Sequence, residues 1–241
     1  MHPDSKDPYE KPTDPAVQRE NDIIEDLQKS GCPVCNYMEE FVFDYLAKWQ
    51  YALANDETAQ REYAAECGFC PAHTWLLAAV ASTRGLSRGY PKLLEYIADE
   101  LLKPIVTSPN LSVNISALVK DSGNCRVCCS LQDAEEAYVH RLAAFLEHEE
   151  AHIAYTRSHG VCLRHLSLLV SFLTSREVVQ FLLSETARHL KETAENMRRY
   201  VLKREALEGD SINRVEMYAY LRALVYIVGV RNVCAPHIRR I

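Results

Sequence analysis

Cysteine and histidine residues recur in this chain at the spacing that a tetrahedral metal site requires. A Cys-x2-Cys pair is followed by a Cys-x2-His pair, and the same order then returns. The four pairs are Cys32 and Cys35, Cys70 and His73, Cys125 and Cys128, and Cys162 and His165. Three thiolates and one imidazole suit a zinc ion, which takes four nitrogen or sulfur ligands in a tetrahedron.

The order of the pairs along the chain predicts two sites, each joining the two ends of a helical hairpin. We expect the first two pairs to form one site and the last two pairs to form the other. The expected ligand sets are Cys32, Cys35, Cys70 and His73, and Cys125, Cys128, Cys162 and His165. Two zinc ions are the predicted cofactors. Two [4Fe-4S]-type iron–sulfur clusters remain the alternative, because three cysteines and a histidine also hold such clusters.

Three further cysteines have no partner in this pattern. Cys67 precedes Cys70 at x2 spacing, but the corresponding residue of the second half is His159. Cys129 follows Cys128 directly and points elsewhere on a helix, and Cys234 repeats the Cys-x2-His pattern with no Cys-x2-Cys pair left to complete a site. We interpret these three as packing or surface thiols.

A literal His-Glu-x-x-His motif runs from His148 to His152. On a helix it would place two imidazoles on one face beside the glutamate base Glu149, as in zinc hydrolases. The corresponding segment of the first half, Asn55 to Gln60, lacks these residues. We therefore interpret the motif as a charged helix end, and enzyme activity is not the favoured hypothesis.

Composition narrows the class of protein. The chain has 241 residues, 48% of them hydrophobic, and a formal net charge of −6. This charge gives no broad attraction to nucleic acid or to an anionic membrane. Nine cysteines, a polar acidic start and no long apolar run favour metal ligation in the cytoplasm over a disulfide framework in a secreted protein.

Helices must position the motifs, and the apolar periodicity predicts an all-α fold. Apolar residues from Val34 to Leu53 recur at steps of three and four. A second helix is expected from Pro71 to Gly85 and a third from Pro91 to Leu102. The polar stretch Asn55 to Gln60 interrupts the pattern, and Pro104 to Asn110 has the composition of a link.

Apolar positions repeat together with the candidate ligands. Val34 corresponds to Val127, Met38 to Leu131, Tyr45 to Tyr138, Leu53 to Leu146, Tyr63 to Tyr155, Leu76 to Leu168, and Leu77 to Leu169. We therefore predict duplicated three-helix metal-binding units, packed as a helical bundle with an extra C-terminal helix. The longest helix is expected from Ser175 to Arg204, and the last from Ile212 to Val228.

The predicted organisation has four parts. Residues 1–22 form a flexible tail, 23–110 the first metal-binding repeat, 111–208 the second, and 209–241 the C-terminal helix and tail. Because four protein ligands fill each site, we expect a non-catalytic scaffold or adaptor that binds a protein partner, with neither nucleic acid nor membrane as its target. An iron–sulfur electron carrier or redox sensor is the alternative.

The motifs Gly31-Cys-Pro-Val-Cys35 and Gly68-Phe-Cys-Pro-Ala-His-Thr-Trp-Leu-Leu77 resemble a family of uncharacterised prokaryotic proteins, defined as a domain of unknown function. Its members are sometimes labelled as transporter substrate-binding proteins. The resemblance extends from about Ile23 to Val228 and implies no particular activity. The second half departs from the motif with Arg126 in place of proline and Ser167 in place of tryptophan, and keeps its candidate ligands.

Overall fold

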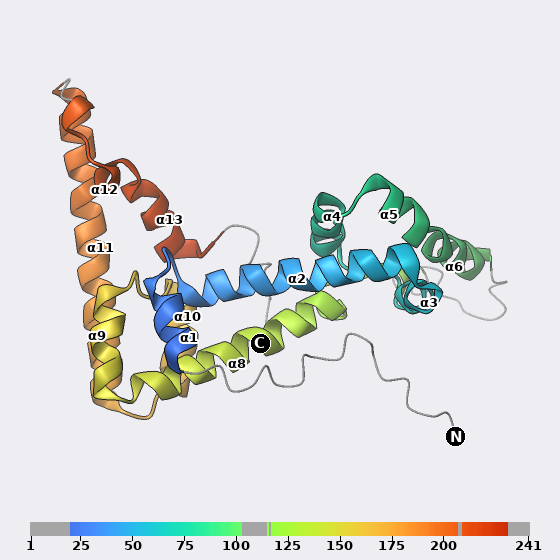
Figure 1. Cartoon of the computed structure of the whole chain (residues 1–241), viewed down its shortest axis with the longest axis horizontal. Coiled ribbons are helices and arrows are strands. Elements are labelled where there is room, and N and C mark those ends of the chain that lie inside the picture. The colour runs from blue at the N-terminus through green and yellow to red at the C-terminus, as the bar shows by residue number, and fades with distance from the viewer. Residues whose placement is uncertain (1–19, 103–114, 116, 207–208, 231–241) are drawn as a thin grey trace. The chain divides into compact units, whose positions relative to one another are not determined.

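The computed structural model describes residues 20–102, 115, 117–206 and 209–230, and all secondary structure in these ranges is helical (Figure 1). The predicted all-α class is therefore confirmed. Most of the predicted tail, the link Pro104–Asn110, Cys234 and His237 lie outside the described residues.

The first half of the described chain contains six helices. They are α1 (Glu20–Gln28), α2 (Pro33–Asn55), α3 (Glu57–Ala65), α4 (Pro71–Val80), α5 (Thr83–Gly89) and α6 (Pro91–Leu102). Pro33, Pro71 and Pro91 each stand at the first position of a helix, where the missing amide proton costs no hydrogen bond. The predicted starts at Pro71 and Pro91 are confirmed, and α6 is helical up to Leu102, the last described residue before the gap.

The second half contains the longest helix of the described chain, α11 (Arg176–Glu205). The other elements of this half are α8 (Arg126–Leu146), α9 (Glu149–Arg157), α10 (Leu163–Phe172), the short 3-10 turn η1 (Gly209–Ser211), α12 (Arg214–Met217) and α13 (Ala219–Val228). Ser175 is the N-cap of α11, and its side chain accepts a hydrogen bond from the Val178 amide. The long helix predicted from Ser175 to Arg204 is thus confirmed to within a residue.

Four details differ from the expected helices, and local capping explains most of them. Asn55–Gln60 is not simply an interruption, because the Asp56 carboxylate accepts a hydrogen bond from Thr58 and starts α3. The Ser82 hydroxyl starts α5 in the same way by accepting from Gly85, so the helix expected from Pro71 to Gly85 is two helices.

The helix expected from Ile212 to Val228 is also divided. Asn213 and Glu216 form a capping box that starts α12, and Tyr218 separates α12 from α13. At the other end of the described chain, the residues from Glu20 onward are already helical, before the expected start of structure at Ile23.

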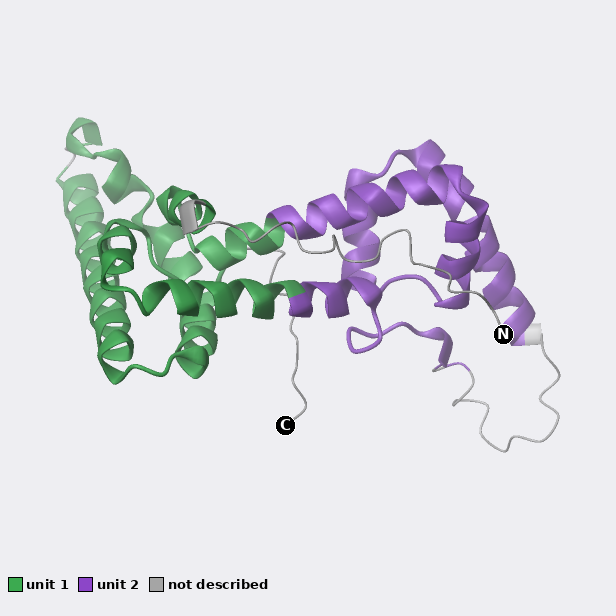
Figure 2. Cartoon of the chain, turned by 60° about the horizontal axis from the view of Figure 1, so that its bottom comes forward, with its two compact units in different colours: residues 1–39, 134–234 green, residues 40–133, 235–241 purple. Residues whose placement is uncertain are grey.

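The chain divides into two compact units, which do not coincide with the two sequence repeats (Figure 2). Among the described residues, unit 1 contains 20–39 and 134–230, and unit 2 contains 40–133. The division falls within α2 and α8, so each of these helices contributes its first residues to one unit and its remaining residues to the other.

Burial follows the predicted apolar positions. Val34, Met38, Leu46, Trp49 and Leu53 of α2 are all at most 2% exposed. Five of the seven corresponding pairs are buried in both halves: Val34 and Val127, Met38 and Leu131, Leu53 and Leu146, Tyr63 and Tyr155, and Leu77 and Leu169. Tyr45 is half-buried where Tyr138 is buried, and Leu76 and Leu168 are both half-buried. The helical stripe read from the sequence is therefore the face that forms the core.

No helix of the described residues combines the length and the apolar character that crossing a lipid bilayer demands.

Candidate metal centres

Two groups of four buried Cys and His side chains converge in the structure. Site 1 consists of Cys32, Cys35, Cys162 and His165, and site 2 consists of Cys70, His73, Cys125 and Cys128. Within each group, all ligand atoms lie within 4.8 Å of one another. Every residue predicted as a metal ligand belongs to one of these groups.

The predicted partition of the ligands is wrong. Each site takes its Cys-x2-Cys pair from one half of the sequence and its Cys-x2-His pair from the other half. Site 1 lies entirely within unit 1, and site 2 lies entirely within unit 2. The metal motifs therefore connect distant parts of the sequence and do not close local hairpins.

Helix lengths explain this exchange. The 23 residues of α2 carry the chain about 34 Å from its start, at 1.5 Å per residue. The nine residues of α3 return it by only about 14 Å. The turn after α3 is tight, because the Gly68 amide donates a hydrogen bond to the Tyr63 carbonyl group, so Cys70 does not return to the start of α2. The 21-residue α8 and the nine-residue α9 separate Cys162 from Cys128 in the same way.

The atoms of site 1 have the separations of one tetrahedral coordination shell. His165 Nδ1 lies 3.3 Å from Cys32 Sγ, 3.4 Å from Cys35 Sγ and 3.2 Å from Cys162 Sγ. The sulfurs of Cys35 and Cys162 are 3.9 Å apart. For comparison, zinc–sulfur bonds of about 2.3 Å in a tetrahedron give a sulfur–sulfur edge of about 3.8 Å.

Site 2 has the same geometry. His73 Nδ1 lies 3.3 Å from the sulfurs of Cys70 and Cys128 and 3.7 Å from that of Cys125. The sulfurs of Cys70 and Cys128 are 3.7 Å apart. Both histidines therefore offer Nδ1 as the ligand atom.

Two helix N-termini meet at each site. The carbonyl groups of Cys32, Cys70, Cys125 and Cys162 each accept the first hydrogen bond of the helix that follows. These helices are α2 and α10 at site 1, and α4 and α8 at site 2. Because the N-terminal end of a helix dipole is positive, it stabilises the thiolate form that metal ions bind.

The loop before each Cys-x2-His pair depends on a glycine and a tyrosine. Gly68 and Gly160 have φ angles of +74° and +67°, a region that side chains disfavour. A Cβ atom on these glycines would also lie 3.2 Å from the Tyr63 hydroxyl and 3.4 Å from the Tyr155 hydroxyl, respectively. The two buried tyrosines thus support the turns that deliver Cys70 and Cys162.

Hydrogen bonds among the ligands favour one deprotonated thiol in each site. Bonds to Cys32 and Cys35 hold the pKa of Cys162 well below the usual range of a thiol, and bonds to Cys128 and Cys70 do the same for Cys125. Burial lowers the pKa of His73, but hydrogen bonds to Cys125 and Cys70 outweigh it and raise this pKa to about 9. Metal binding must therefore displace protons from the site.

Glu135 is a functional residue that the sequence reasoning missed. Its carboxylate oxygen Oε1 accepts a hydrogen bond from His165 Nε2 at 2.8 Å and lies 2.7 Å from Arg164 Nη2. A carboxylate on the second nitrogen of a histidine ligand fixes the tautomer and orientation of the ring. One sequence signal could have revealed it: Glu135 occupies an apolar stripe position, and its counterpart in the first half is Val42.

Replacing Glu135 by glutamine is expected to weaken metal binding at site 1 by about 10- to 100-fold, the usual cost of losing such a carboxylate. Competition titration with a chromogenic chelator would measure the two affinities of the chain. Glu136→Gln is the matched control, because Glu136 is the exposed neighbour of the 6% exposed Glu135. Equal site 1 affinities in the two variants would contradict the proposed orienting role.

Arg126 explains one departure of the second half from the motif. Its guanidinium group forms an ion pair with Glu66, the C-cap residue of α3, and lies 5.1 Å from the centre of the Trp49 ring. Trp49 also packs edge-on against Phe69 next to the site 2 loop. Arg126 thus joins the start of α8 to the parts of unit 2 that present Cys70.

The remaining candidate residues stay outside both groups. Cys129 is exposed, and the half-buried Cys67 has a left-handed backbone, with φ of +57°. His148 is the N-cap of α9, while His152 stacks on Phe181 and its Nε2 lies 3.0 Å from the Leu146 carbonyl oxygen. Within the described chain, neither histidine belongs to a group of potential metal ligands.

Comparison of the chain with protein-family models, with curated proteins and with solved structures finds no match. The resemblance to a domain-of-unknown-function family therefore stays a prediction. The function must be argued from the two sites themselves.

Proposed function

We propose that the protein is a metal-stabilised helical scaffold in which sites 1 and 2 each hold one zinc ion. The separations within each site support a single ion, because they match the edges of one coordination tetrahedron. In a four-iron cluster each ligand binds a different iron atom. A cluster of this kind therefore needs ligand atoms that stand farther apart than those of sites 1 and 2.

The coordination supports a structural role. Four protein ligands complete the preferred coordination of zinc and leave no position for a water molecule or a substrate. The ligands are also deeply buried, with exposures between 0% and 4%. Catalytic zinc sites keep one open position, so these two sites are better suited to holding helices together.

A scaffold acts through its surface, and the proposal therefore includes a protein partner. Trp75 of α4 is 77% exposed although it stands only two residues from the ligand His73. Aromatic side chains are enriched in the buried centres of protein interfaces. Trp75 is thus a candidate contact of unit 2, and its counterpart in unit 1 is Ser167.

Metal analysis of anaerobically purified protein tests the proposal. We expect two zinc ions per chain by mass spectrometry of the metals, no labile sulfide and no absorption band in the visible range. A Cys129→Ser variant should keep the same zinc content, because Cys129 belongs to neither site. Iron with labile sulfide would replace the proposal by the alternative, an iron–sulfur electron carrier or redox sensor.

A further inference from the structure

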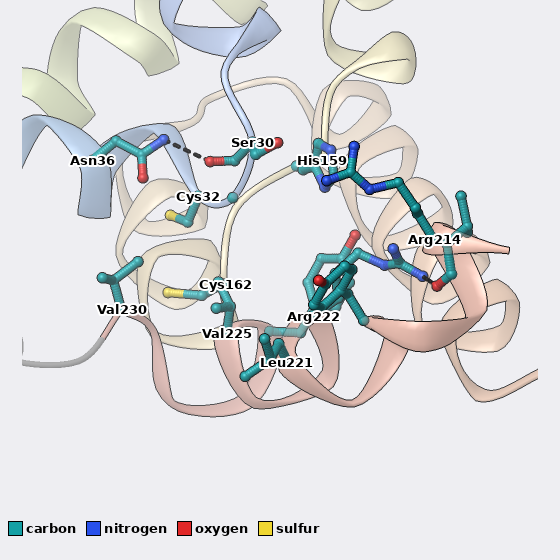
Figure 3. A pocket seen from close by; sticks show the side chains of 15 residues that line it. Ser30, Cys32, Asn36, His159, Cys162, Arg214, Leu221, Arg222, Val225 and Val230 are labelled. Atoms are coloured by element: carbon teal, nitrogen blue, oxygen red, sulfur yellow. Dashed lines mark hydrogen bonds between the residues drawn. The ribbon is translucent and has the colours of Figure 1, made fainter. Parts of the chain in front are cut away.

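Unit 1 contains a cavity of about 500 Å³ that borders site 1 (Figure 3). Its walls come from the turn Ser30–Cys32, from the loop that contains His159 and Cys162, and from α12 and α13. Binding sites for small molecules have volumes of roughly 300–1,000 Å³, so this cavity has the size of a ligand site.

Contacts with α11 hold the helices that line the cavity in place. Lys203 of α11 lies 2.8 Å from both carboxylate oxygens of the buried Glu216, which attaches α12 to α11. Tyr226 of α13 lies against His189 of α11, with ring centres 6.2 Å apart. These contacts fix α12 and α13, which form one wall of the cavity, against α11.

Positive charge collects on one side of the cavity. Arg214 and Arg222 line it, and Figure 3 shows both on the side away from the sulfurs of Cys32 and Cys162. None of its lining residues is an aspartate or a glutamate, and in the described part of the chain no carboxylate forms an ion pair with either arginine. Arg222 is oriented by a hydrogen bond of 2.6 Å to the Val215 carbonyl group.

The positive charge also affects the imidazole of His159, which lines the same cavity. Burial lowers the pKa of His159, and the charge of Arg222 lowers it further. An anion placed between these groups would compensate the two guanidinium charges. The polar side of the cavity is therefore complementary to an acid group.

The rest of the cavity is apolar. Val215, Tyr218 and Leu221 lie together at the cavity and are 51%, 44% and 43% exposed. Val225 and the buried Tyr226 continue this apolar surface into the cavity. A ligand that covers these side chains must have an apolar body of its own.

We propose that this cavity binds a small amphipathic acid. Its anionic group would pair with Arg214 and Arg222, and its apolar body would cover Tyr218, Leu221 and Val225. Charge-assisted hydrogen bonds to guanidinium groups would give orientation, and the apolar contacts would add affinity. This binding function goes beyond the structural role of the zinc sites and does not depend on which metal occupies site 1.

Isothermal titration calorimetry of the full, metal-loaded chain tests the proposal with three probes of equal chain length. Octanoate should bind at one site per chain, whereas 1-octanol should bind at least tenfold more weakly and octyltrimethylammonium should not bind. The difference reflects the loss of charge-assisted hydrogen bonds to the arginines. Equal binding of octanoate and octanol, or no binding of octanoate, would overturn the proposal.

Variants locate the binding. The Arg214→Gln variant should weaken octanoate binding by about tenfold. The double variant that also carries Arg222→Gln should weaken it by more than tenfold. Arg176→Gln removes an exposed arginine of the same unit outside the cavity and should change nothing. Circular dichroism checks that Arg222→Gln keeps its helices.

A second copy of the chain is the competing occupant of the exposed apolar side chains. Sedimentation velocity distinguishes it, because Leu221→Ser would then convert a dimer into a monomer. Such a dimer, together with no response to octanoate, would contradict the small-ligand proposal.

Discussion

Replacing Cys35 and Cys162 together by serine is expected to leave one zinc ion per chain, whereas replacing Cys35 and Cys70 together is expected to leave none. Cys35 and Cys162 are ligands of the same site, 3.9 Å apart, while Cys35 and Cys70 belong to different sites. A site with three remaining ligands holds zinc too weakly to keep it during dialysis against a chelator of moderate strength. Zinc content after that dialysis is the measurement.

These two double variants distinguish the observed sites from the hairpin sites expected from the sequence, because the hairpin sites predict the reverse result. If Cys35 and Cys70 shared a site, the Cys35→Ser and Cys70→Ser double variant would keep one zinc ion and the Cys35→Ser and Cys162→Ser variant would keep none. The single variants each lose one ion under both arrangements and serve as controls for the method. Zinc retained in the reverse pattern would therefore refute the exchanged sites.

Removing the metal from the wild-type chain is expected to unfold much of it. Zinc in a structural site contributes about 10–16 kcal/mol of apparent binding free energy near neutral pH. The net stability of a folded domain is only about 5–15 kcal/mol, so the loss of either ion is large on this scale. Chelation should lower the helical circular dichroism signal and the thermal transition temperature, and added zinc should restore both.

The effect should increase at lower pH. Zinc binds deprotonated ligands, and protons compete for them more strongly as the pH falls. The same loss of helix should therefore need less chelator at about pH 6 than at about pH 8. A stripped chain that keeps the transition temperature of the zinc-loaded chain would show that the ions do not hold the fold.

Local sequence patterns predicted the helices well because their causes are local. The stripe from Val34 to Leu53 lies within α2, and its positions Val34, Met38, Val42, Leu46, Trp49 and Leu53 are all buried. Short helices were less predictable. In α3 and α5 a single capping side chain, Asp56 or Ser82, decides where the helix starts.

Features that depend on several distant elements were not predictable in the same way. Glu135 acts on site 1 because the middle of α8 passes His165. Its place in an apolar stripe marks the residue as unusual, but does not say what the side chain contacts. The cavity with Arg214 and Arg222 exists because α12 and α13 lie next to the turn before Cys32 and the loop before Cys162. Arg126 departs from the motif, and only the structure shows that its guanidinium group pairs with Glu66 and lies over the Trp49 ring.

The sequence by itself determined which residues are candidate ligands, since thiolate and imidazole chemistry belongs to the residue type and the x2 spacing brings two donors together. Only the tertiary structure decided how the four pairs combine. The reason is that α2 and α8 carry the chain about 34 Å and about 32 Å away from each Cys-x2-Cys pair, whereas α3 and α9 return it by only about 14 Å. The turns that follow α3 and α9 are tight and add little length. The pair from the other half of the sequence completes each site.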